Sequence, residues 1–493
     1  MTDIVFIAIP KLETKGPILA ITQLKACVKE AGFSSNCYDF NIWLYNKTKN
    51  TDLDYIWQVL DNTLITNNIK SIEQEYIKYW NEFYQEQIAK ENPKIIGITA
   101  FSSWSYPNID IITRQIKKVN PHVKIVIGGP AVREEPPDKS TYGYDENPEY
   151  FYELKKEGLI DDFISGDAEI SVVEYLKGNS YPGINDFDPK EIEDQSSIPA
   201  PDYEGIDMSL YTDPHYFIKG SRGCVRNCAF CNVPLIWKTF RSRSGEDVAD
   251  EIITLYEKYN FKKVYLIDSL TNGNQKEFIN LMENIALYKK YNKKAKFNIG
   301  GQFICREKNQ VPSRMFDLMK RSGYGTPTIG IESGSEKVRK ELGKYFSNES
   351  IEYHLQEMER VGIKMIPLFF VGFPTETDED FEESVKLLDM FVKYKDVVKR
   401  IHMDHPMHII PGTPVHIDPE KYDIRNITNS YEWESDHNDY KKRIERFFIL
   451  LNEAIKRDLY DRPTVSNKSY TMINDYYKYN KLDKRVVEIM ESW

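Results

Sequence analysis

The chain has 493 residues, of which 41% are hydrophobic and 29% charged, and its formal net charge is −11. This length and composition are typical of a globular protein with about three domains. No block rich in lysine or arginine stands out. A nucleic-acid substrate is therefore disfavoured, because phosphate binding needs a basic surface.

No stretch of the sequence approaches the ~18 uninterrupted apolar residues of a membrane-spanning helix. The apolar run at the N-terminus has the length of a strand and no basic region before it, so no signal peptide is expected. Three of the six cysteines lie close together, which indicates ligand use in a reducing compartment rather than a disulfide framework. We therefore expect a cytoplasmic protein without a membrane span.

Residues 1–180 alternate short apolar runs with helical stretches. This alternation predicts β-α-β units and an α/β fold with a doubly wound, Rossmann-like parallel sheet. Residues 50–92 are polar and rich in aromatic side chains, and they predict a helical insertion between the second and third strands. The expected strands are Ile4–Ile9, Asn36–Phe40, Ile95–Ala100, Val123–Ile127 and Phe163–Ile164.

Residues 181–206 are rich in Asp, Pro and Ser and lack apolar periodicity, which is typical of a linker. A second alternating series over residues 207–415 predicts a partial (β/α)6 barrel of the TIM type. Residues 416–493 are polar and tyrosine-rich, and predict a small α-helical C-terminal region. The expected barrel strands are Tyr216–Lys219, Lys263–Ile267, Lys296–Ile299, Thr328–Ile331, Met365–Val371 and Arg400–Ile410.

The most informative motif is the CxxxCxxC triplet Cys224, Cys228 and Cys231, just after the first barrel strand. Three thiolates at this spacing can ligate three irons of a 4Fe–4S cube and leave the fourth iron open. The alternatives are a zinc knuckle without its fourth ligand and three unrelated buried cysteines. No histidine or cysteine follows at zinc-finger spacing, since the next cysteine is Cys305. The spacing therefore favours an iron–sulfur cluster at the C-terminal mouth of the barrel.

The triplet resembles the cluster motif of the radical S-adenosylmethionine (SAM) enzymes. The segment Gly330–Val338 resembles the family segment whose glutamate contacts the bound cofactor. The resemblance implies that the open iron binds the amino and carboxylate groups of SAM, and that Glu332 accepts hydrogen bonds from it. The competing interpretation of Glu332 is a carboxylate favoured by the N-terminus of the following helix.

On the adenine side of SAM, the resemblance implies three further candidates. Phe230, or the backbone around Asn232, would meet the adenine ring. Gly372, in the turn after the fifth strand, would line the same side. The alternatives are that Phe230 only packs the cysteine loop and that Gly372 belongs to a plain strand-to-helix turn.

Near the methionine part of SAM, the resemblance places Asp268 and Ser269, which end the second barrel strand. Arg243 or Arg241 could hold the carboxylate of the cofactor in a forked contact. A surface role for either arginine is an equal alternative.

The expected strand Arg400–Ile410 carries three polar residues on one face, namely His402, Asp404 and His408. Period-two alternation would turn this face to the barrel interior, where the three residues could contact substrate or transfer protons. The alternative is that these polar residues only fill the barrel, with their hydrogen bonds made to neighbouring protein groups. His405 would fall on the opposite face, which argues against a metal site made by the histidines.

Together, the two halves resemble the radical SAM enzymes that carry an N-terminal cobalamin (B12)-binding domain. The pair Gly128 and Gly129 after a strand suits close approach of a cobalamin tail, which Thr99, Ser102 and Ser103 could hydrogen-bond. The DxHxxG motif that supplies an axial histidine in some cobalamin proteins is missing from this domain. Bound cobalamin is therefore expected to lack a histidine ligand.

The resemblance implies an enzyme that cleaves SAM reductively and functionalises an unactivated carbon. Cobalamin-dependent C-methylation of a small-molecule or peptide substrate is the leading interpretation. The alternative is a cyclase, rearrangement or oxidative enzyme without cobalamin, and a non-catalytic cobalamin or cluster sensor is least favoured. Methylthiolation of tRNA fits worse, because such relatives carry a second cluster on three cysteines of the first domain, where only Cys27 and Cys37 are present. An electron donor such as flavodoxin or ferredoxin is the expected partner.

Overall fold

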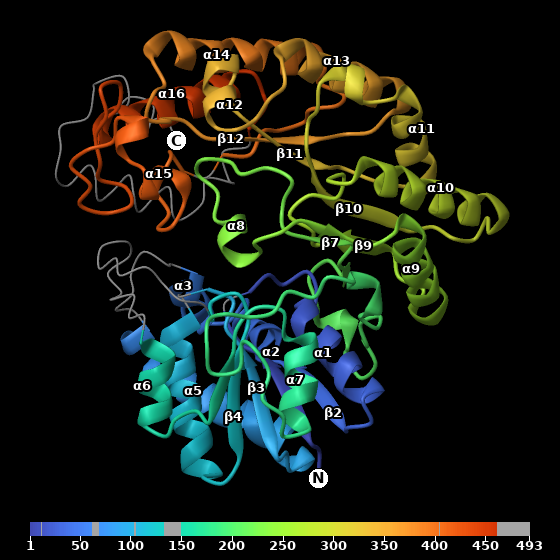
Figure 1. Ribbon diagram of the computed structural model, residues 1–493, viewed down its shortest axis with the longest axis vertical. Helices are drawn as coiled ribbons and strands as arrows, with labels where there is room; N and C mark the ends of the chain where they lie inside the picture. Colours follow the sequence, from blue (N-terminus) through green and yellow to red (C-terminus); the bar gives the residue numbers. More distant parts are fainter. Residues whose placement is uncertain (11, 62–68, 103–104, 133–148, 404, 461–493) are drawn as a thin grey trace. The chain divides into compact units, whose positions relative to one another are not determined.

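The computed structural model describes residues 1–10, 12–61, 69–102, 105–132, 149–403 and 405–460 of the chain. Its backbone forms two compact units, Met1–Ile218 and Lys219–Trp493, and two five-stranded sheets (Figure 1). In this part of the chain, no helix is both long and apolar enough to cross a membrane.

The sheet of the first unit has the order β2-β1-β3-β4-β5, and every strand runs parallel to its neighbours. Side chains of the central strand β1 alternate between two apolar cores, with Val5 and Ile7 in one and Ile4 and Phe6 in the other. A parallel sheet covered by helices on both faces requires two such cores, so the predicted doubly wound sheet is confirmed. The strands are β1 (Ile4–Ala8), β2 (Ser35–Asp39), β3 (Ile95–Thr99), β4 (Lys124–Gly128) and β5 (Asp162–Ile164).

Helices α1 and α7 contribute to one of these cores, and helices α2 to α6 contribute to the other (Figure 1). The insertion after β2 is helical, and its helix α4 presents an aromatic stripe with the spacing of a helix face. Trp80 and Phe83 of this stripe pack on Phe40, with ring centroids 5.1 and 4.9 Å apart. The helices are α1 (Leu19–Glu30), α2 (Phe40–Thr48), α3 (Asp54–Asp61), α4 (Glu73–Phe83), α5 (Tyr106–Val119), α6 (Tyr150–Lys156) and α7 (Ala168–Leu176).

The segment predicted as a linker, residues 181–206, belongs to the first compact unit. Ile192 and Gln195 are buried, and Asp202 forms an ion pair with the buried Lys25 at 3.3 Å. The segment is therefore packed within the first unit over part of its length, and the division of the sequence into four parts remains a proposal.

The second sheet has the order β12-β11-β10-β9-β6, and the pairs among β9 to β12 are parallel. Ser244 begins α9 by accepting a hydrogen bond from the Asp247 N–H at 3.1 Å. Strands alternate with helices along this series, which gives the barrel-type architecture expected for the second half (Figure 1). The strands and helices of the series are β6 (Tyr216–Ile218), α9 (Gly245–Tyr259), β9 (Lys263–Leu266), α10 (Gln275–Tyr291), β10 (Asn298–Phe303), α11 (Ser313–Ser322), β11 (Thr328–Glu332), α12 (Glu336–Glu341), α13 (Asn348–Val361), β12 (Ile366–Phe369) and α14 (Asp378–Lys393).

The predicted sixth barrel strand, Arg400–Ile410, is wrong. Within the described part of this segment only His402 forms a bridge, to Leu368 of β12, and the rest is irregular. Pro406 offers no N–H to a sheet and restrains the residue before it, which explains why the ladder stops. The expected alternation of faces along residues 400–410 therefore does not hold.

The C-terminal region contains α15 (Pro414–Ile417) and the long helix α16 (Tyr440–Lys456). Two arginines of α16, Arg443 and Arg446, are buried. Residues 461–493 of the region predicted to be helical lie outside the described residues.

Candidate cofactor site

The three predicted ligand cysteines lie in the loop between β7 (Ser221–Arg222) and α8 (Val233–Ile236), which we call the cysteine loop. Cys228 is buried, and Cys224 and Cys231 are half-buried. The backbone N–H groups of Arg226 and Val233 donate to the sulfurs of Cys224 and Cys231 at 3.4 and 3.5 Å. Such donors favour the thiolate, which is the form that binds iron.

The cysteine loop is fixed to the barrel by close backbone contacts. Gly223 has φ +75°, and a Cβ there would lie 2.4 Å from the carbonyl oxygen of Thr239, so the position requires glycine. Ala229 donates its N–H to Leu342 at 3.1 Å and accepts one from Val415 at 3.1 Å. The loop is thus held in one conformation by three separate segments.

Among the described residues, no three His, Cys, Asp or Glu side chains are arranged to hold a single metal ion. A zinc knuckle requires such convergence on one ion. In a 4Fe–4S cube each cysteine ligates a different iron, so the thiols stand apart around the cube. The donor set, three cysteines in one loop without a fourth ligand, therefore fits the cube better than a zinc knuckle.

Glu332 ends β11 in a backbone conformation that a glutamate rarely adopts. Its φ is +69°, and the pairing of β11 with β12 shifts register between Gly330 and Glu332. A non-glycine residue in this region is strained, and such strain concentrates at functional sites. The side chain is buried, and its Oε1 accepts a hydrogen bond from Lys344 at 2.9 Å. Its Oε2 accepts none from the described residues, so that oxygen is available to a ligand.

The Glu332→Gln variant should keep the cluster and bind SAM about ten- to a hundredfold more weakly. The substitution preserves the shape of the side chain and removes one charged acceptor, a loss of roughly 1.5–3 kcal/mol. Equilibrium binding of SAM to the anaerobically reconstituted protein measures the change. Unchanged affinity would limit Glu332 to a structural role in the bulge of β11.

The three residues predicted for the adenine side lie in or beside tightly packed turns. Phe230 is half-buried and packs edge-on against Phe370, with ring centroids 5.0 Å apart. Gly372 has φ +82°, and its N–H donates to the buried Glu376 at 2.7 Å. Asn232 is half-buried and precedes α8 without a side-chain cap. The packing of Phe230 and the bond made by Gly372 are compatible with both interpretations made from the sequence.

Two of the residues predicted near the methionine part of SAM are occupied within the fold. Asp268 is buried, and it accepts the Gly220 N–H at 2.8 Å, while burial raises the pKa of its carboxyl to about 6. Arg243 forms an ion pair with the buried Glu251 at 2.5 Å. Both side chains therefore anchor the chain around the cysteine loop. Ser269, at the end of β9, is half-buried.

Arg306 is a candidate that the sequence analysis missed. It follows β10, and its guanidinium donates to the carbonyl oxygens of Asn272 and Gly273 at 3.1 and 2.8 Å. Within the described part of the chain, its buried Nε has no hydrogen-bond partner and no carboxylate pairs with it. Arg306 is thus better placed than Arg243 to hold a carboxylate, but no sequence motif marks it.

The histidines of residues 400–410 are arranged differently from the prediction. His402 is exposed, and its backbone joins β12. His405 and His408 are neighbours, with Nδ1 atoms 3.3 Å apart and ring centroids 4.5 Å apart, so His405 does not lie on the opposite side from His408. The ring of His408 also lies 5.3 Å from that of Tyr431. Asp404 lies outside the described residues.

The edge of the first sheet where β3 and β4 end has features that fit a ligand tail. Thr99 and Gly128 are register partners on these strands. The hydroxyl of Thr99 is buried and has no hydrogen-bond partner among the described residues, where a Cβ at Gly128 would meet only the carbonyl oxygen of Ile164, at 3.7 Å. Ser102 is half-buried, and Ser103 lies outside the described residues. An unpartnered hydroxyl beside an open glycine fits the predicted cobalamin tail.

Gly129 has a different role from its neighbour. Its φ is +115°, and a Cβ there would lie 2.5 Å from the carbonyl oxygen of Ala100. Glycine is therefore required by the turn itself, whatever binds there.

The sequence of this unit contains two histidines, His122 and His215. His122 is exposed in a turn, and His215 lies directly before β6.

The Thr99→Val variant should separate stability from binding. It removes a buried, unpartnered hydroxyl, so thermal unfolding should show equal or higher stability, by up to about 1 kcal/mol. Cobalamin retention should fall, because the ligand loses a hydrogen-bond donor or acceptor. Retention equal to the wild-type value would show that Thr99 does not contact the ligand.

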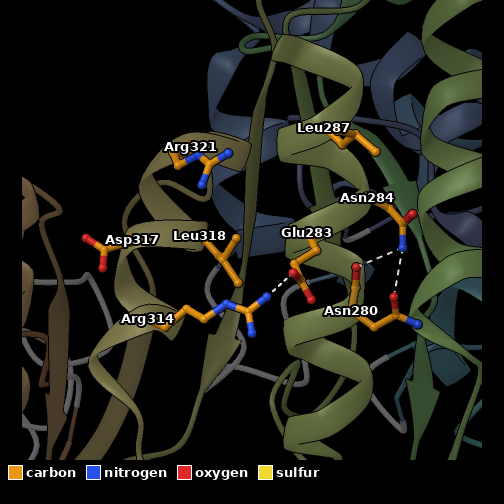
Figure 2. Close-up of a pocket in the computed structure, with 8 residues that line it drawn as sticks. All are labelled: Asn280, Glu283, Asn284, Leu287, Arg314, Asp317, Leu318 and Arg321. Carbon is orange, nitrogen blue, oxygen red and sulfur yellow. Dashed lines mark hydrogen bonds and ion pairs between the residues drawn. The ribbon is translucent and has the colours of Figure 1, made fainter. Parts of the chain in front are cut away.

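A surface pocket lies between α10 and α11, away from the strand ends (Figure 2). Three of its four charged side chains are paired with neighbours: Glu283 with Arg314 across the pocket, and Asp317 with Arg360 at 2.7 Å. The pocket therefore shows no chemistry that would connect it to the cysteine loop. It is lined by Asn280, Glu283, Asn284, Leu287, Arg314, Asp317, Leu318 and Arg321.

Comparison with protein families gives two matches. Residues 218–388 match the Radical SAM superfamily, and residues 71–155 match the B12 binding domain. The first range contains the cysteine loop and Glu332, and the second contains Thr99 and the two glycines Gly128 and Gly129.

Curated relatives share about a quarter of their residues with this chain. An uncharacterised methyltransferase of Pyrococcus horikoshii is 27% identical over 330 residues, which cover 63% of this chain and 66% of the relative. A ribosomal protein uS12 methylthiotransferase of Thermotoga maritima is 26% identical over 43% of this chain and 50% of its own length. The chain thus spans between half and two thirds of these relatives.

Two solved structures share the fold. The radical SAM methyltransferase TsrM from Kitasatospora setae superposes with a TM-score of 0.62 and 15% identity, over 85% of this chain and 76% of that chain. The cobalamin-dependent SAM radical enzyme OxsB superposes with a TM-score of 0.62 and 15% identity, over 100% of this chain and 75% of that chain. The two matches, to the B12 binding domain and to the Radical SAM superfamily, thus confirm the resemblance seen in the sequence, and the two solved structures share the fold.

Proposed function

We propose that this protein is a cobalamin-dependent radical SAM enzyme that methylates an unactivated carbon of a small-molecule or peptide substrate. The observation that carries this proposal is the presence of both cofactor-type sites on one chain. One is the cysteine loop with Glu332, and the other is the sheet edge formed by Thr99 and Gly128.

When bound, a 4Fe–4S cluster supplies the electron that cleaves SAM, and cobalamin supplies a transferable methyl group. Cys224, Cys228 and Cys231 would hold the cluster. Glu332 would orient SAM against it through its free carboxylate oxygen, and Arg306 would hold a carboxylate at the same mouth. Such positioning sets the reaction's selectivity, because the protein has to present one hydrogen of the substrate and exclude water.

The cysteines of the first unit argue against methylthiolation, the activity for which one of the relatives is named. The sequence of this unit contains two cysteines, Cys27 and Cys37, and both are buried. Burial raises the pKa of Cys37 to about 12, which disfavours a thiolate ligand there. A second cluster on three cysteines therefore has no ligand set in this unit.

We further propose an electron donor of the flavodoxin or ferredoxin type and a cytoplasmic location. Reductive cleavage of SAM needs one electron from outside the protein. The clustered cysteines suit a reducing compartment. The net charge of −11 disfavours a nucleic-acid substrate.

Isotope transfer tests the proposed reaction. The protein is reconstituted without oxygen with iron, sulfide and cobalamin, reduced, and incubated with SAM that carries a trideuterated methyl group and with an extract of small molecules and peptides. The expected result is a product that carries the deuterated methyl group, detected by mass spectrometry. A product that changes structure without gaining this group would instead establish the cyclase, rearrangement or oxidative alternative.

A further inference from the structure

Lys344 is a buried lysine just beyond the C-terminal end of α12, and no sequence motif pointed to it. Its side chain is 10% exposed, and its Nζ donates to Glu332 Oε1 and to the carbonyl oxygen of Gly330, both at 2.9 Å. An ammonium group is rarely buried, since removing it from water costs several kcal/mol unless it is well paired. The ion pair with Glu332 meets that requirement.

The segment that carries Lys344 also lies directly on the cysteine loop. A Cβ at Gly343 would be 3.3 Å from the carbonyl oxygen of Asn227 and 3.6 Å from the Cα of Cys228. The preceding residue, Leu342, accepts the N–H of Ala229 at 3.1 Å. Residues 342–344 therefore connect the cofactor glutamate with the cysteine loop.

The electrostatics agree with this placement. Burial raises the pKa of the Cys228 thiol, and the Lys344 ammonium opposes that rise. It acts in the same sense on Cys224 and Cys231. Burial also lowers the pKa of Lys344 itself, but Glu332 and Cys228 raise it above its ordinary value. The lysine thus remains charged beside the carboxylate of Glu332.

A second cation, Arg226, faces the same region from within the cysteine loop. Its guanidinium donates to the carbonyl oxygens of Gly343 and Cys305 at 3.2 and 3.3 Å. These bonds hold the loop against the end of α12 and the end of β10. Arg226 contacts backbone, whereas Lys344 contacts the carboxylate, so the two cations have separate roles.

We propose that Lys344 is a positioning residue that couples Glu332 to the cluster site. It fixes the carboxylate in its strained position, and its charge stabilises the cluster when the cluster gains an electron and becomes more negative. This inference rests on the proposed function, because it assumes that the three cysteines hold a cluster.

A redox titration of three variants tests the coupling. Each protein is reconstituted without oxygen, and the midpoint potential of the cluster is followed by paramagnetic resonance. Lys344→Met should shift the potential to more negative values, because it removes a positive charge, and Glu332→Gln should shift it to more positive values. The double variant should return close to the wild-type potential, since it removes both charges of the pair.

A matched control is available on α12 itself. Lys340 is exposed and forms no ion pair with the described residues, and Lys340→Met makes the same charge change four residues from Lys344. It should leave the potential unchanged. Lys344→Arg keeps the charge, so its midpoint potential should stay close to the wild-type value. SAM affinity gives a second readout, in which Lys344→Met should lose about ten- to a hundredfold.

The outcomes separate the inference from the proposed function. A wild-type protein that assembles no cluster overturns both. A Lys344→Met protein with a full cluster, the wild-type potential and the wild-type SAM affinity overturns only the role of Lys344. Should Lys344→Met and the double variant both fail to assemble a cluster, Lys344 serves folding and the coupling is rejected. If the double variant assembles a cluster and Lys344→Met does not, the coupling is supported, because the unpaired carboxylate of Glu332 is then the cause of the defect.

Discussion

The Cys228→Ala variant is expected to lose both the iron–sulfur cluster and the cleavage of SAM. Cys228 is the buried member of the triplet, and removing one of three ligands leaves a second iron of the cube without protein coordination. Iron content, absorbance of the cluster and formation of 5′-deoxyadenosine from SAM measure the loss. The wild-type protein should bind about four irons per chain.

Cys305→Ala is the matched control, because Cys305 is also buried in the second unit but lies outside the triplet. Its sulfur contacts Nδ1 of the buried His354 at 3.5 Å, which is a structural interaction. This variant should assemble the cluster normally. Cleavage of SAM that survived in Cys228→Ala would disprove the ligand assignment.

The Gly128→Val variant is expected to abolish cobalamin retention while the cluster assembles as in the wild type. Gly128 lies at the end of β4, where an added Cβ meets no backbone atom closer than 3.7 Å. A valine is therefore compatible with the strand, but it would occupy the space in which the cobalamin tail is expected. Binding is measured by the absorbance of cobalamin that stays with the protein after gel filtration.

A substitution at the neighbouring Gly129 would not serve as the same test. Gly129→Val would collide with Ala100 at a backbone φ of +115°, so its loss of cobalamin would only report a damaged turn. Thermal unfolding distinguishes the two variants, since Gly128→Val should unfold close to the wild-type temperature. Full cobalamin retention in Gly128→Val would place the ligand elsewhere.

The sequence predicted those parts of the fold that depend on local pattern. Buried runs such as Ile4–Ile9 identify parallel strands by themselves, and the spacing of Cys224, Cys228 and Cys231 places three ligands in one loop. The segment Arg400–Ile410 was wrong because the alternation of its side chains suggested a strand. The hydrogen-bond ladder of a sheet depends instead on backbone N–H donors, and Pro406 has none.

The site residues that the sequence missed act through tertiary contacts. Lys344 and Arg306 carry no motif, and their roles follow from what lies beside them after folding, namely Glu332 for the first and backbone carbonyls for the second. Conversely, Arg243 has a suitable position in the sequence, but folding pairs it with Glu251. Spacing can locate a cofactor loop, whereas the partner of each charged side chain is decided by packing.

The cofactor content of the wild-type protein tests the central claim most directly. The protein is reconstituted without oxygen with iron, sulfide and excess cobalamin, separated from unbound cofactors, and analysed for iron and cobalt. The account predicts about four irons and one cobalamin on the same chain. A protein that held the irons but no cobalamin would contradict it and would leave a radical SAM enzyme without methyl transfer.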